Sequence, residues 1–462
     1  MTSSAHSPRT RDGLASVVKA YDVRGVVGEG IDADLVRDTG AAFGNLMRAE
    51  GASTVVIGHD MRPSSPDLAD AFAAGVTSQG LDAVQLGLTS TDELYYASGS
   101  LDCPGAMFTA SHNPAKYNGI KMCRAGARPV GQDTGLTEIV DMLVDGVPPY
   151  QGAAGTVTQK DVLGDYASYL KKLVPLDGIR PLTVTVDAGN GMGGLTAPAV
   201  LGTEPSLTLH DLYFELDGTF PNHEANPLDP KNLVDLEKYT VETGSDIGVA
   251  FDGDADRCFI VDEKGEAVSP SAICAMIAER YLEQNPGATI IHNLITSKAV
   301  PEIIREHGGH PVRTRVGHSF IKARMAEEHA VFGGEHSAHY YFSDFFNADS
   351  GMIAALHVLA TLGAGDRPLS ELKKQYSRYE ASGEINSRVD DQAGRTAAVV
   401  RAFADETTST DDLDGVTVEL ADGSWFNVRA SNTEPLLRLN VEAPTRARID
   451  EIVAKALGVI RG

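Results

Sequence analysis

The sequence predicts an α/β protein in which three related α/β domains with mixed sheets precede a smaller α+β domain. The chain of 462 residues is too long for a single hydrophobic core. An apolar, strand-like run that leads through a polar turn into helix-compatible sequence begins near residues 54, 183 and 289. This repetition is typical of α/β units. Near the C-terminus, apolar and polar residues alternate instead, which indicates antiparallel strands.

The first domain begins with an extended segment over 17–25. Apolar residues at helical spacing then predict a helix over 31–50, and the run 54–57 predicts a buried strand. A second helix is expected over about 65–79, and a further strand leads to the apolar residues 106–108. This order of helix, strand, loop and helix defines an α/β unit.

The second and third domains repeat this plan. The strand at 183–186 runs into the glycine-rich turn 187–194, and the strand at 289–291 runs into the polar stretch 292–298. Glycine-rich turns after strands can bind nucleotides. This one has neither the Gly-Lys-Ser/Thr ending of a P-loop nor the spacing of the dinucleotide fingerprint. We therefore interpret it as a tight strand-to-helix turn.

The last domain is predicted to hold an antiparallel sheet and a helix. Strands are expected at 416–420, 425–429 and 437–441, and a helix over about 445–457. Proline- and glycine-rich stretches place joints near 148–155, near Gly265 and within 367–383. The predicted domains are 1–152, 153–262, 263–372 and 373–462.

Composition limits the partners and the compartment. The formal net charge of −25 argues against nucleic acid and anionic membranes as partners, so local arginines and backbone amides must capture an anionic substrate. The four cysteines form no Cys-x-x-Cys pair, which favours a reducing cytoplasm over a disulfide framework or a zinc site. Residues 1–13 lack the apolar core of a signal peptide, and no apolar run is long enough to cross a bilayer.

A serine and a histidine stand together in the stretch Thr109-Ala110-Ser111-His112-Asn113-Pro114. The proline keeps the preceding residue out of a helix, so Ser111 lies on a turn. Its hydroxyl could act as a nucleophile or carry a phosphate. The alternative is an ordinary hydrogen-bonded turn. A serine hydrolase is disfavoured, because Ser111 lacks the glycines two places either side that a nucleophile elbow needs.

Three carboxylates alternate with small residues between two predicted strands, at Asp252, Asp254 and Asp256. They would repel one another unless a hard divalent cation lies among them, and a phosphate oxygen is a usual further ligand of magnesium. Arg257 would stand beside that phosphate. A calcium loop of the EF-hand type is the alternative, with Glu263 as its last ligand. It is opposed by the strand-like flanks and by an arginine where that loop needs glycine.

Two further loops are rich in polar groups. The stretch 333–339 combines glycines with donors and acceptors that suit a sugar, although His336 and His339 could also be a structural pair or half a metal site. The stretch 429–435, with Arg438 beyond it, offers an arginine fork, hydroxyls and backbone amides for a phosphate dianion. The alternative for this second loop is a β-turn. A weaker signal of the same kind lies at 315–318.

The four main stretches, 109–114, 252–257, 333–339 and 429–435, resemble in this order those of the α-D-phosphohexomutase superfamily. The resemblance runs from about Lys19 to the C-terminus. The loop 334–339 and the following 340–342 are similar to the bacterial phosphomannomutase and phosphoglucomutase group rather than to the phosphoglucosamine enzymes. Ala255 and Ala338 stand where glycine is common in that group. The resemblance implies α/β domains around a central cleft.

The resemblance also implies a mechanism. Ser111 would be phosphorylated in the resting enzyme, and Mg²⁺ would bridge its phosphate and the aspartates Asp252, Asp254 and Asp256. Magnesium and Arg257 would offset charge in the transition state. Arg24, otherwise a surface charge, would contact the phosphoserine. His112 and Lys121 are the candidate proton carriers, and a buried ammonium near other positive charge is expected to have a lowered pKa.

The implied reaction interconverts mannose 6-phosphate and mannose 1-phosphate through a hexose 1,6-bisphosphate, which also serves as activator. Glucose phosphates, alone or together with mannose phosphates, are the alternative substrates. A metal-dependent sugar phosphatase and a non-catalytic calcium-binding protein are weaker alternatives. A monomer or weak dimer in the cytoplasm is expected. The residues expected to bind substrate are Lys298, Gly317, His318, Glu335, Ser337, His339, Arg429, Ser431, Asn432, Thr433 and Arg438.

Overall fold

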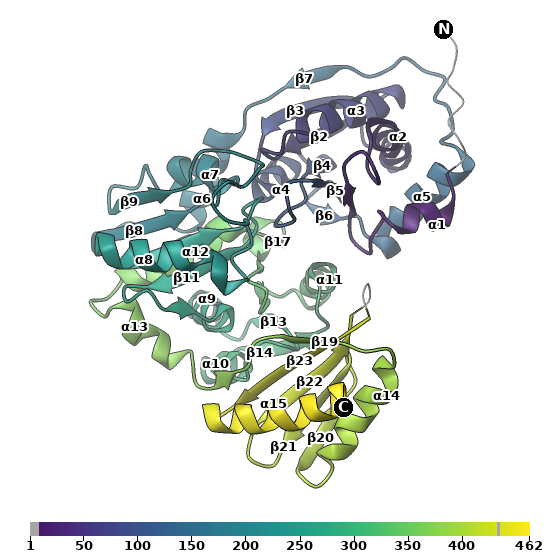
Figure 1. Ribbon diagram of the computed structural model, residues 1–462. Helices are drawn as coiled ribbons and strands as arrows, with labels where there is room; N and C mark the ends of the chain where they lie inside the picture. Colours follow the sequence, from purple (N-terminus) through teal and green to yellow (C-terminus); the bar gives the residue numbers. More distant parts are fainter. Residues whose placement is uncertain (1–8, 432–434) are drawn as a thin grey trace. The chain divides into compact units, whose positions relative to one another are not determined.

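The computed structural model describes residues 9–431 and 435–462 (Figure 1). The chain forms two compact units. The first unit comprises Met1–Val268 and Ser337–Ser370, and the second comprises Ser269–His336 and Glu371–Gly462. Within the described ranges, no helix combines the length and the apolar character needed to cross a membrane.

A mixed sheet forms the N-terminal part of the first unit. In spatial order its strands are β1 (Val23–Val26), β5 (Tyr117–Arg124), β4 (Gly105–Phe108), β2 (Thr54–His59), β3 (Asp82–Leu88) and β7 (Val157–Gln159), and β6 (Arg128–Pro129) pairs with β5. β2 is parallel to β3 and β4, whereas β4 is antiparallel to β5. The loop 109–116, which carries Ser111, therefore lies at the edge of the sheet where β2 and β4 end.

The helices of this part are α1 (Arg11–Ala15), α2 (Ala33–Ala49), α3 (Ser65–Ser78), α4 (Thr91–Ser100) and α5 (Leu136–Asp145). α2 begins after Asp32, whose side chain accepts a hydrogen bond from Leu35 N (2.7 Å). At Gly40 a side-chain carbon would lie 2.3 Å from Phe72 O, so glycine permits the close packing of α2 on α3. The helix and strand predicted over 31–57 are confirmed as α2 and β2.

The second sheet of the first unit carries the loop with the three aspartates. In spatial order its strands are β12 (Ala267–Val268), β11 (Cys258–Asp262), β10 (Ile247–Phe251), β8 (Leu182–Asp187) and β9 (Leu207–Leu212). Its sequence also forms α6 (Leu163–Leu173), α7 (Gly193–Val200) and α8 (Val234–Thr243). β10 is antiparallel to β11 and parallel to β8, so residues 252–257 turn at the carboxyl end of β10.

The segment Ser337–Ser370 completes the first unit. It forms the antiparallel strands β16 (Tyr340–Phe342) and β17 (Ala348–Asp349), then α12 (Gly351–Gly363). α12 is apolar and almost entirely buried, which is expected of a helix that is hydrophobic on all sides. The short helix α13 (Leu369–Leu372) follows.

The second unit begins with a parallel sheet of β14 (His310–Thr314), β13 (Thr289–Asn293) and β15 (Phe332–Gly334). Its helices are α9 (Pro270–Gln284), α10 (Ala299–Glu306) and α11 (His318–Glu328). Gly333 and Gly334 of the predicted sugar-binding stretch form the end of β15, and its polar residues from Glu335 onward follow the strand directly. In a parallel sheet the carboxyl ends of neighbouring strands lie along one edge, which is the usual place for a ligand.

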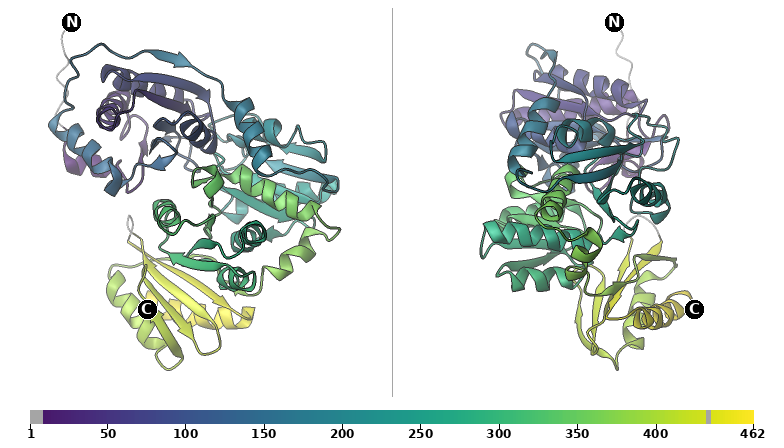
Figure 2. Two further views of the ribbon diagram at one scale, coloured as in Figure 1. Left: turned by 180° about the vertical axis from the view of Figure 1, so that it is seen from behind. Right: turned by 90° about the vertical axis from the view of Figure 1, so that its left-hand side faces the viewer.

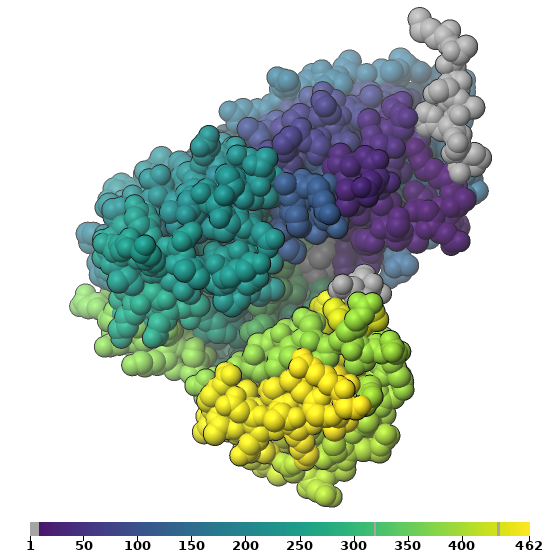
Figure 3. Space-filling view, viewed as in Figure 1, coloured from purple at the N-terminus to yellow at the C-terminus, as the bar shows by residue number. Residues whose placement is uncertain are grey.

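The C-terminal domain is an antiparallel sheet with two helices on one face (Figure 2). In spatial order its strands are β18 (Glu380–Ala381), β23 (Leu436–Ala443), β22 (Trp425–Ala430), β21 (Val416–Leu420) and β20 (Thr407–Asp411), and β19 (Ile385–Arg388) also pairs with β23. The helices are α14 (Gln392–Ala402) and α15 (Arg446–Arg461). Figure 3 shows the side chains of α15 spread over the outer face of this domain. The predicted fold class, α/β domains followed by an α+β domain, is confirmed.

Candidate active site

Ser111 lies in the loop between β4 and β5, and only 5% of its surface is exposed. Its Oγ donates a hydrogen bond to Asp252 Oδ2 (2.7 Å) and lies 3.1 Å from His112 Nδ1. Its backbone has a φ of +50°, in the left-handed region that a serine rarely adopts. The structure therefore joins two stretches that are 141 residues apart in the chain.

The aspartate loop presents its carboxylates toward one another. Ligand atoms of Asp252, Asp254 and Asp256 lie within 4.8 Å of one another, and all three residues are buried. Burial raises the pKa of Asp252 to about 7, even though Arg257 opposes this shift through Nε and Nη2, which donate to Asp252 Oδ2 (3.0 and 2.8 Å). Burial also acts to raise the pKa of Asp254, but Lys121 outweighs it, so that pKa lies below its usual value.

The same loop fits a divalent cation. Asp254 Oδ1 and Asp256 Oδ1 are buried oxygens without a hydrogen-bond partner among the described residues. Buried carboxylate oxygens of this kind are costly unless a cation binds them. The EF-hand alternative is wrong, because the loop joins β10 to β11. The carboxylate of Glu263, its supposed last ligand, instead accepts a hydrogen bond from Ser370 N (3.0 Å).

Lys121 on β5 lies within the carboxylate cluster. Its Nζ is 2.6 Å from Asp254 Oδ2 and 2.5 Å from Asp256 Oδ2. Burial acts to lower the pKa of Lys121, but these two carboxylates outweigh burial and raise it well above its usual value. The expectation of a lowered pKa was wrong, because the nearest charges are negative rather than positive.

His112 has the opposite electrostatic environment. Burial first, and then the positive charges of Arg257 and Arg24, hold its pKa well below the usual value. The imidazole is therefore neutral near pH 7 and can accept a proton, and its Nδ1 lies 3.1 Å from Ser111 Oγ. The sequence leaves open which of His112 and Lys121 acts as acid and which as base. In the structure the two groups differ in their pKa shifts, which are downward for His112 and upward for Lys121.

Arg24 on β1 is half-buried beside the serine loop. Its Nη1 donates to Asn113 Oδ1 (2.7 Å) and its Nη2 donates to Asp22 Oδ2 (2.6 Å). Two further residues at the centre were missed from the sequence. Thr91, the first residue of α4, donates from Oγ1 to Asp254 Oδ2 (2.7 Å). Arg62 donates to the carbonyl of Ser111 (2.8 Å).

The two histidines of the predicted sugar loop have different partners. His339 Nδ1 lies 2.9 Å from Asp349 Oδ2 and 3.8 Å from Asp256 Oδ1, so His339 belongs to the aspartate cluster of the first unit. His336 Nδ1 lies 3.0 Å from Ser271 Oγ in the second unit. They do not form a metal-binding pair. Ser337, also expected to bind substrate, is the first residue of the segment that completes the first unit.

Glu335 lies at the carboxyl end of β15 and is 2% exposed. Asn293, at the end of the neighbouring strand β13, donates to its Oε2 (3.3 Å). At the end of β14, Gly317 adopts a φ of +134° before α11 begins. Val316 N, beside this glycine, donates to Asp414 Oδ2 (3.2 Å), and Arg429 Nη1 lies 3.6 Å from the same oxygen. The structure thus brings the Gly317 turn and Arg429 together.

Arg429 and Arg438 face each other directly across β22 and β23. Both lie close to Glu384, at 3.5 and 3.6 Å. Their Nε atoms are buried, and neither has a hydrogen-bond partner in the part of the chain that the structure describes. Like charges opposite each other on antiparallel strands are destabilising, so this pair suits an anion. Ser431 N bonds Leu436 O (2.8 Å) and closes the loop.

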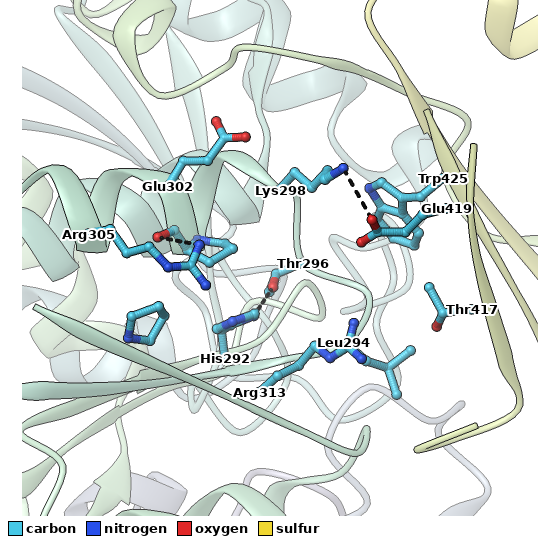
Figure 4. A pocket seen from close by; sticks show the side chains of 12 residues that line it. His292, Leu294, Thr296, Lys298, Glu302, Arg305, Arg313, Thr417, Glu419 and Trp425 are labelled. Atoms are coloured by element: carbon cyan, nitrogen blue, oxygen red, sulfur yellow. Dashed lines mark hydrogen bonds and ion pairs between the residues drawn. The ribbon is translucent and has the colours of Figure 1, made fainter. Parts of the chain in front are cut away.

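Lys298 lies elsewhere in the second unit (Figure 4). Its Nζ points toward Gly423 O (3.4 Å) and Glu419 Oε2 (3.9 Å), in a pocket of about 280 Å³. These partners lie at the turn between β21 and β22, whereas Arg429 lies at the other end of β22. Lys298 is thus not among the groups that gather around Arg429. The side chain of His318 and the residues Asn432 and Thr433 lie outside the described residues.

A buried serine that donates to a metal-competent carboxylate loop suits phosphoryl transfer, and the fold that carries it is that of the phosphohexomutases. Family models of phosphoglucomutase/phosphomannomutase match all four domains. α/β/α domain I matches residues 15–144, domain II matches 165–265, domain III matches 269–379 and the C-terminal domain matches 384–458. The chain therefore belongs to the phosphoglucomutase/phosphomannomutase family.

Individual relatives agree with this assignment. A phosphomannomutase of Salmonella montevideo is 40% identical over 434 residues, which cover 92% of this chain and 94% of that protein. A protein of Xanthomonas campestris pv. campestris named phosphohexose mutases is 38% identical, with the same two shares covered. A crystal structure of a family protein from Burkholderia thailandensis has a TM-score of 0.86 at 32% identity and covers 96% of this chain and 98% of that one.

Proposed function

We propose that this protein interconverts the 6- and 1-phosphates of mannose through a phosphoserine at Ser111 and a hexose 1,6-bisphosphate. The hydrogen bond from Ser111 Oγ to Asp252 is the observation that carries the proposal. It places the Ser111 hydroxyl against the three carboxylates, and two of their oxygens, on Asp254 and Asp256, have no hydrogen-bond partner among the described residues. A hydroxyl in that position can take a phosphoryl group and present it to a cation.

His112 would carry the proton that Ser111 loses when it is phosphorylated. When Ser111 takes the phosphoryl group from the bisphosphate, its hydroxyl proton passes to His112 Nδ1, which is neutral and 3.1 Å away. His112 then gives this proton to the sugar oxygen that leaves, so the exchange conserves protons. In the reverse step the sugar hydroxyl gives its proton to His112, which passes it to Ser111 Oγ. Lys121 stays an ammonium and compensates the charge of Asp254 and Asp256.

Asp252, Asp254 and Asp256 would hold Mg²⁺ together with a phosphate oxygen on Ser111. The bound cation would neutralise charge on the transferring phosphoryl group. Arg257, fixed by two hydrogen bonds to Asp252, would add positive charge on the same side. Arg24 would contact the phosphoserine from β1, which it already approaches through Asn113.

The phosphate that does not react would bind at the facing pair Arg429 and Arg438, with Ser431, Asn432 and Thr433 supplying further donors. Glu335 and Ser337 would bind sugar hydroxyls. Gly317, His318 and His339 complete the proposed set. Lys298 is the weakest member, because its ammonium points toward Glu419. The borders 1–152, 153–262, 263–372 and 373–462 remain our proposed domain limits.

Free cysteines fit the proposed cytoplasmic location, since the described chain contains no disulfide. Mannose phosphate is favoured as substrate by the names of the Salmonella relatives. Glucose phosphates are the second candidate, because a relative of similar identity is named for hexose phosphates in general.

The test is a comparison of kcat/KM for mannose 1-phosphate and glucose 1-phosphate, with Mg²⁺ and a catalytic amount of hexose 1,6-bisphosphate. We expect turnover of both and a higher kcat/KM for the mannose compound. A higher value for glucose 1-phosphate would reverse the substrate assignment. Release of inorganic phosphate in place of isomer would show a phosphatase instead.

A further inference from the structure

Arg62 is the largest fully buried side chain of the protein's described part, and the mechanism above gives it no role. It follows β2, at the edge of the sheet where the Ser111 loop lies. Its Nη2 donates to Ser111 O (2.8 Å) and Asn113 O (2.7 Å). Its Nη1 donates to Pro114 O and Tyr117 O, both at 3.0 Å. One guanidinium thus contacts both ends of the loop.

The guanidinium itself is held in place by Asp60. Arg62 Nε donates to Asp60 Oδ2 (3.1 Å), which gives the last of its five N–H groups a partner. Asp60 Oδ1 accepts hydrogen bonds from Arg62 N (3.0 Å) and Ser65 Oγ (2.6 Å). Both members of this ion pair have no exposed surface in their side chains. A buried ion pair is weak evidence for stability, so its occurrence here needs another explanation.

The backbone of Ser111 supplies that explanation. A non-glycine residue at a φ of +50° is strained by about 1–3 kcal/mol and keeps this conformation only where its surroundings enforce it. Arg62 fixes the carbonyl of Ser111, and Thr109 Oγ1 accepts from its N–H (2.9 Å). The aspartate loop also packs closely on this carbonyl, because a side-chain carbon at Gly253 would lie 2.4 Å from Ser111 O. The backbone of Ser111 is therefore held between Arg62 and the aspartate loop.

We infer that Arg62 is a positioning residue that holds the loop 111–117 in the strained conformation that directs Ser111 Oγ toward Asp252. The inference rests on the proposed phosphoserine function. Lysine cannot replace arginine here, because its ammonium has three N–H groups and no planar fork, so it cannot reach the separate carbonyls together. Loss of the hydrogen bonds from the Arg62 guanidinium to the loop lets Ser111 return to an ordinary φ and turns its Oγ away from Asp252.

The test compares Arg62→Lys with a matched control, Arg180→Lys. Arg180 is also an arginine of the first unit that binds main-chain carbonyls, Gly365 O (3.1 Å) and Pro181 O (3.2 Å), and pairs with Asp246. In Arg62→Lys we expect kcat to fall by about 100-fold, because small misplacements of a reacting group have effects of that size. KM should stay within about threefold, because the clamp acts on the reacting serine and not on substrate binding. Arg180→Lys should change neither constant by more than about threefold.

Two further measurements separate positioning from simple loss of stability. Hydrogen exchange at the amides of 111–117 should accelerate in Arg62→Lys, while the amides of β2 and β4 remain protected. Rephosphorylation of Ser111 by hexose 1,6-bisphosphate should slow by the same factor as kcat. A kcat within about threefold of wild type, or a loss confined to KM, would overturn the inference.

If Arg62→Lys does not fold, Asp60→Asn tests the inference in its place. This change loosens the guanidinium of Arg62 but leaves the arginine in the chain. The same fall in kcat and the same local exchange are expected, and an unchanged kcat with a loosened loop contradicts the inference. Failure of the proposed function looks different: wild-type protein and Arg180→Lys would then lack phosphoserine and be unable to gain it.

Discussion

Asp252 and Asp254 lie two residues apart, yet the fold gives their carboxyl groups opposite pKa shifts. Asp252 is raised to about 7 by burial, and Asp254 is lowered because Lys121 outweighs burial. Thr91 adds a hydrogen bond to Asp254 Oδ2, which leaves Oδ1 free for a cation. The rest of the site therefore keeps Asp254 ionised.

Asp254→Asn should weaken magnesium binding more than any change outside the loop. The variant loses one negative charge and one of the unpartnered oxygens, so half-maximal activity should need a higher Mg²⁺ concentration, and the maximal rate should fall by about 100-fold or more. Asp145→Asn, at an exposed position at the end of α5, is the matched control and should behave as wild type. An unchanged magnesium titration in Asp254→Asn would show that the ion binds elsewhere.

The sequence indicated candidate site residues that the structure brings together, but not the residues that hold them in place. Ser111, Asp252 and Arg257 could be singled out, because each lies in a short stretch whose residue types suggest phosphoryl transfer or metal binding. Arg62 and Thr91 could not, since they act through contacts with residues far along the chain. The pKa direction of Lys121 was wrong for the same reason: its neighbours are known only once β5 is placed beside the aspartate loop.

Among the secondary-structure elements, α4 connects the N-terminal sheet to the aspartate loop, because it packs on β2 and β4 and its first residue, Thr91, bonds Asp254. Its N-terminus forms a capping box, in which Ser90 Oγ accepts from Glu93 N (3.2 Å) and the Glu93 carboxylate accepts from Ser90 N (3.3 Å). The pattern Ser-x-x-Glu is visible in the sequence, but no helix was predicted there. Burial raises the pKa of Glu93 to about 8, against the opposing hydrogen bond from Ser90.

Glu93→Gln should remove a pH dependence of stability. The pKa of Glu93 in the folded protein, about 8, lies above the usual value of 4.5. The stabilisation that protonated Glu93 adds to the free energy of unfolding is therefore fully present below about pH 4.5 and is lost as the pH rises to about 8. The glutamine variant should therefore gain on wild type as the pH rises, by about 1–3 kcal/mol at pH 8. Urea unfolding of the first unit at pH 5 and at pH 8 measures the difference. Exposed Glu138→Gln is the control, and a parallel pH dependence in Glu93→Gln and wild type would contradict the account.

The elements of the C-terminal domain were the easiest to predict. The strands expected at 416–420, 425–429 and 437–441 match β21, β22 and β23, because apolar residues at every second position of each strand lie in the core. The segment that forms β16, β17 and α12 gave no such signal. Its residues are apolar on all sides, and burial from every direction removes the periodicity on which prediction depends.

In the molecule as a whole, the proposed reacting centre around Ser111 and the proposed phosphate clamp, Arg429 and Arg438, are built from different parts of the chain. Ser111, the aspartates, Lys121 and His339 belong to the first unit. Arg429, Arg438 and Glu335 belong to the second. The hydrogen bonds and ion pairs described above for each set join residues of one and the same unit. Changes in the clamp should therefore leave the chemistry at Ser111 intact.

Arg429→Ala should weaken substrate binding and leave phosphoserine in place. Loss of one charged partner of a desolvated phosphate costs about 2–5 kcal/mol, which appears as a higher KM in both directions. Exposed Arg446→Ala on α15 serves as the control for removal of an arginine from the same unit. The measurement is KM and kcat in both directions together with phosphoserine content. An unaltered KM, or phosphoserine lost along with activity, would rule out this loop as the distal clamp.

The phosphorylation state of Ser111 tests the central claim most directly. Dephosphorylated protein is incubated with hexose 1,6-bisphosphate and Mg²⁺, and intact mass and peptide mapping are recorded beside Ser111→Ala. The account predicts a gain of roughly 80 Da located on Ser111. It also predicts that Ser111→Ala gains no phosphate and is inactive although it keeps its fold. Full activity without that gain, or a phosphate on any other residue of the active protein, would contradict it.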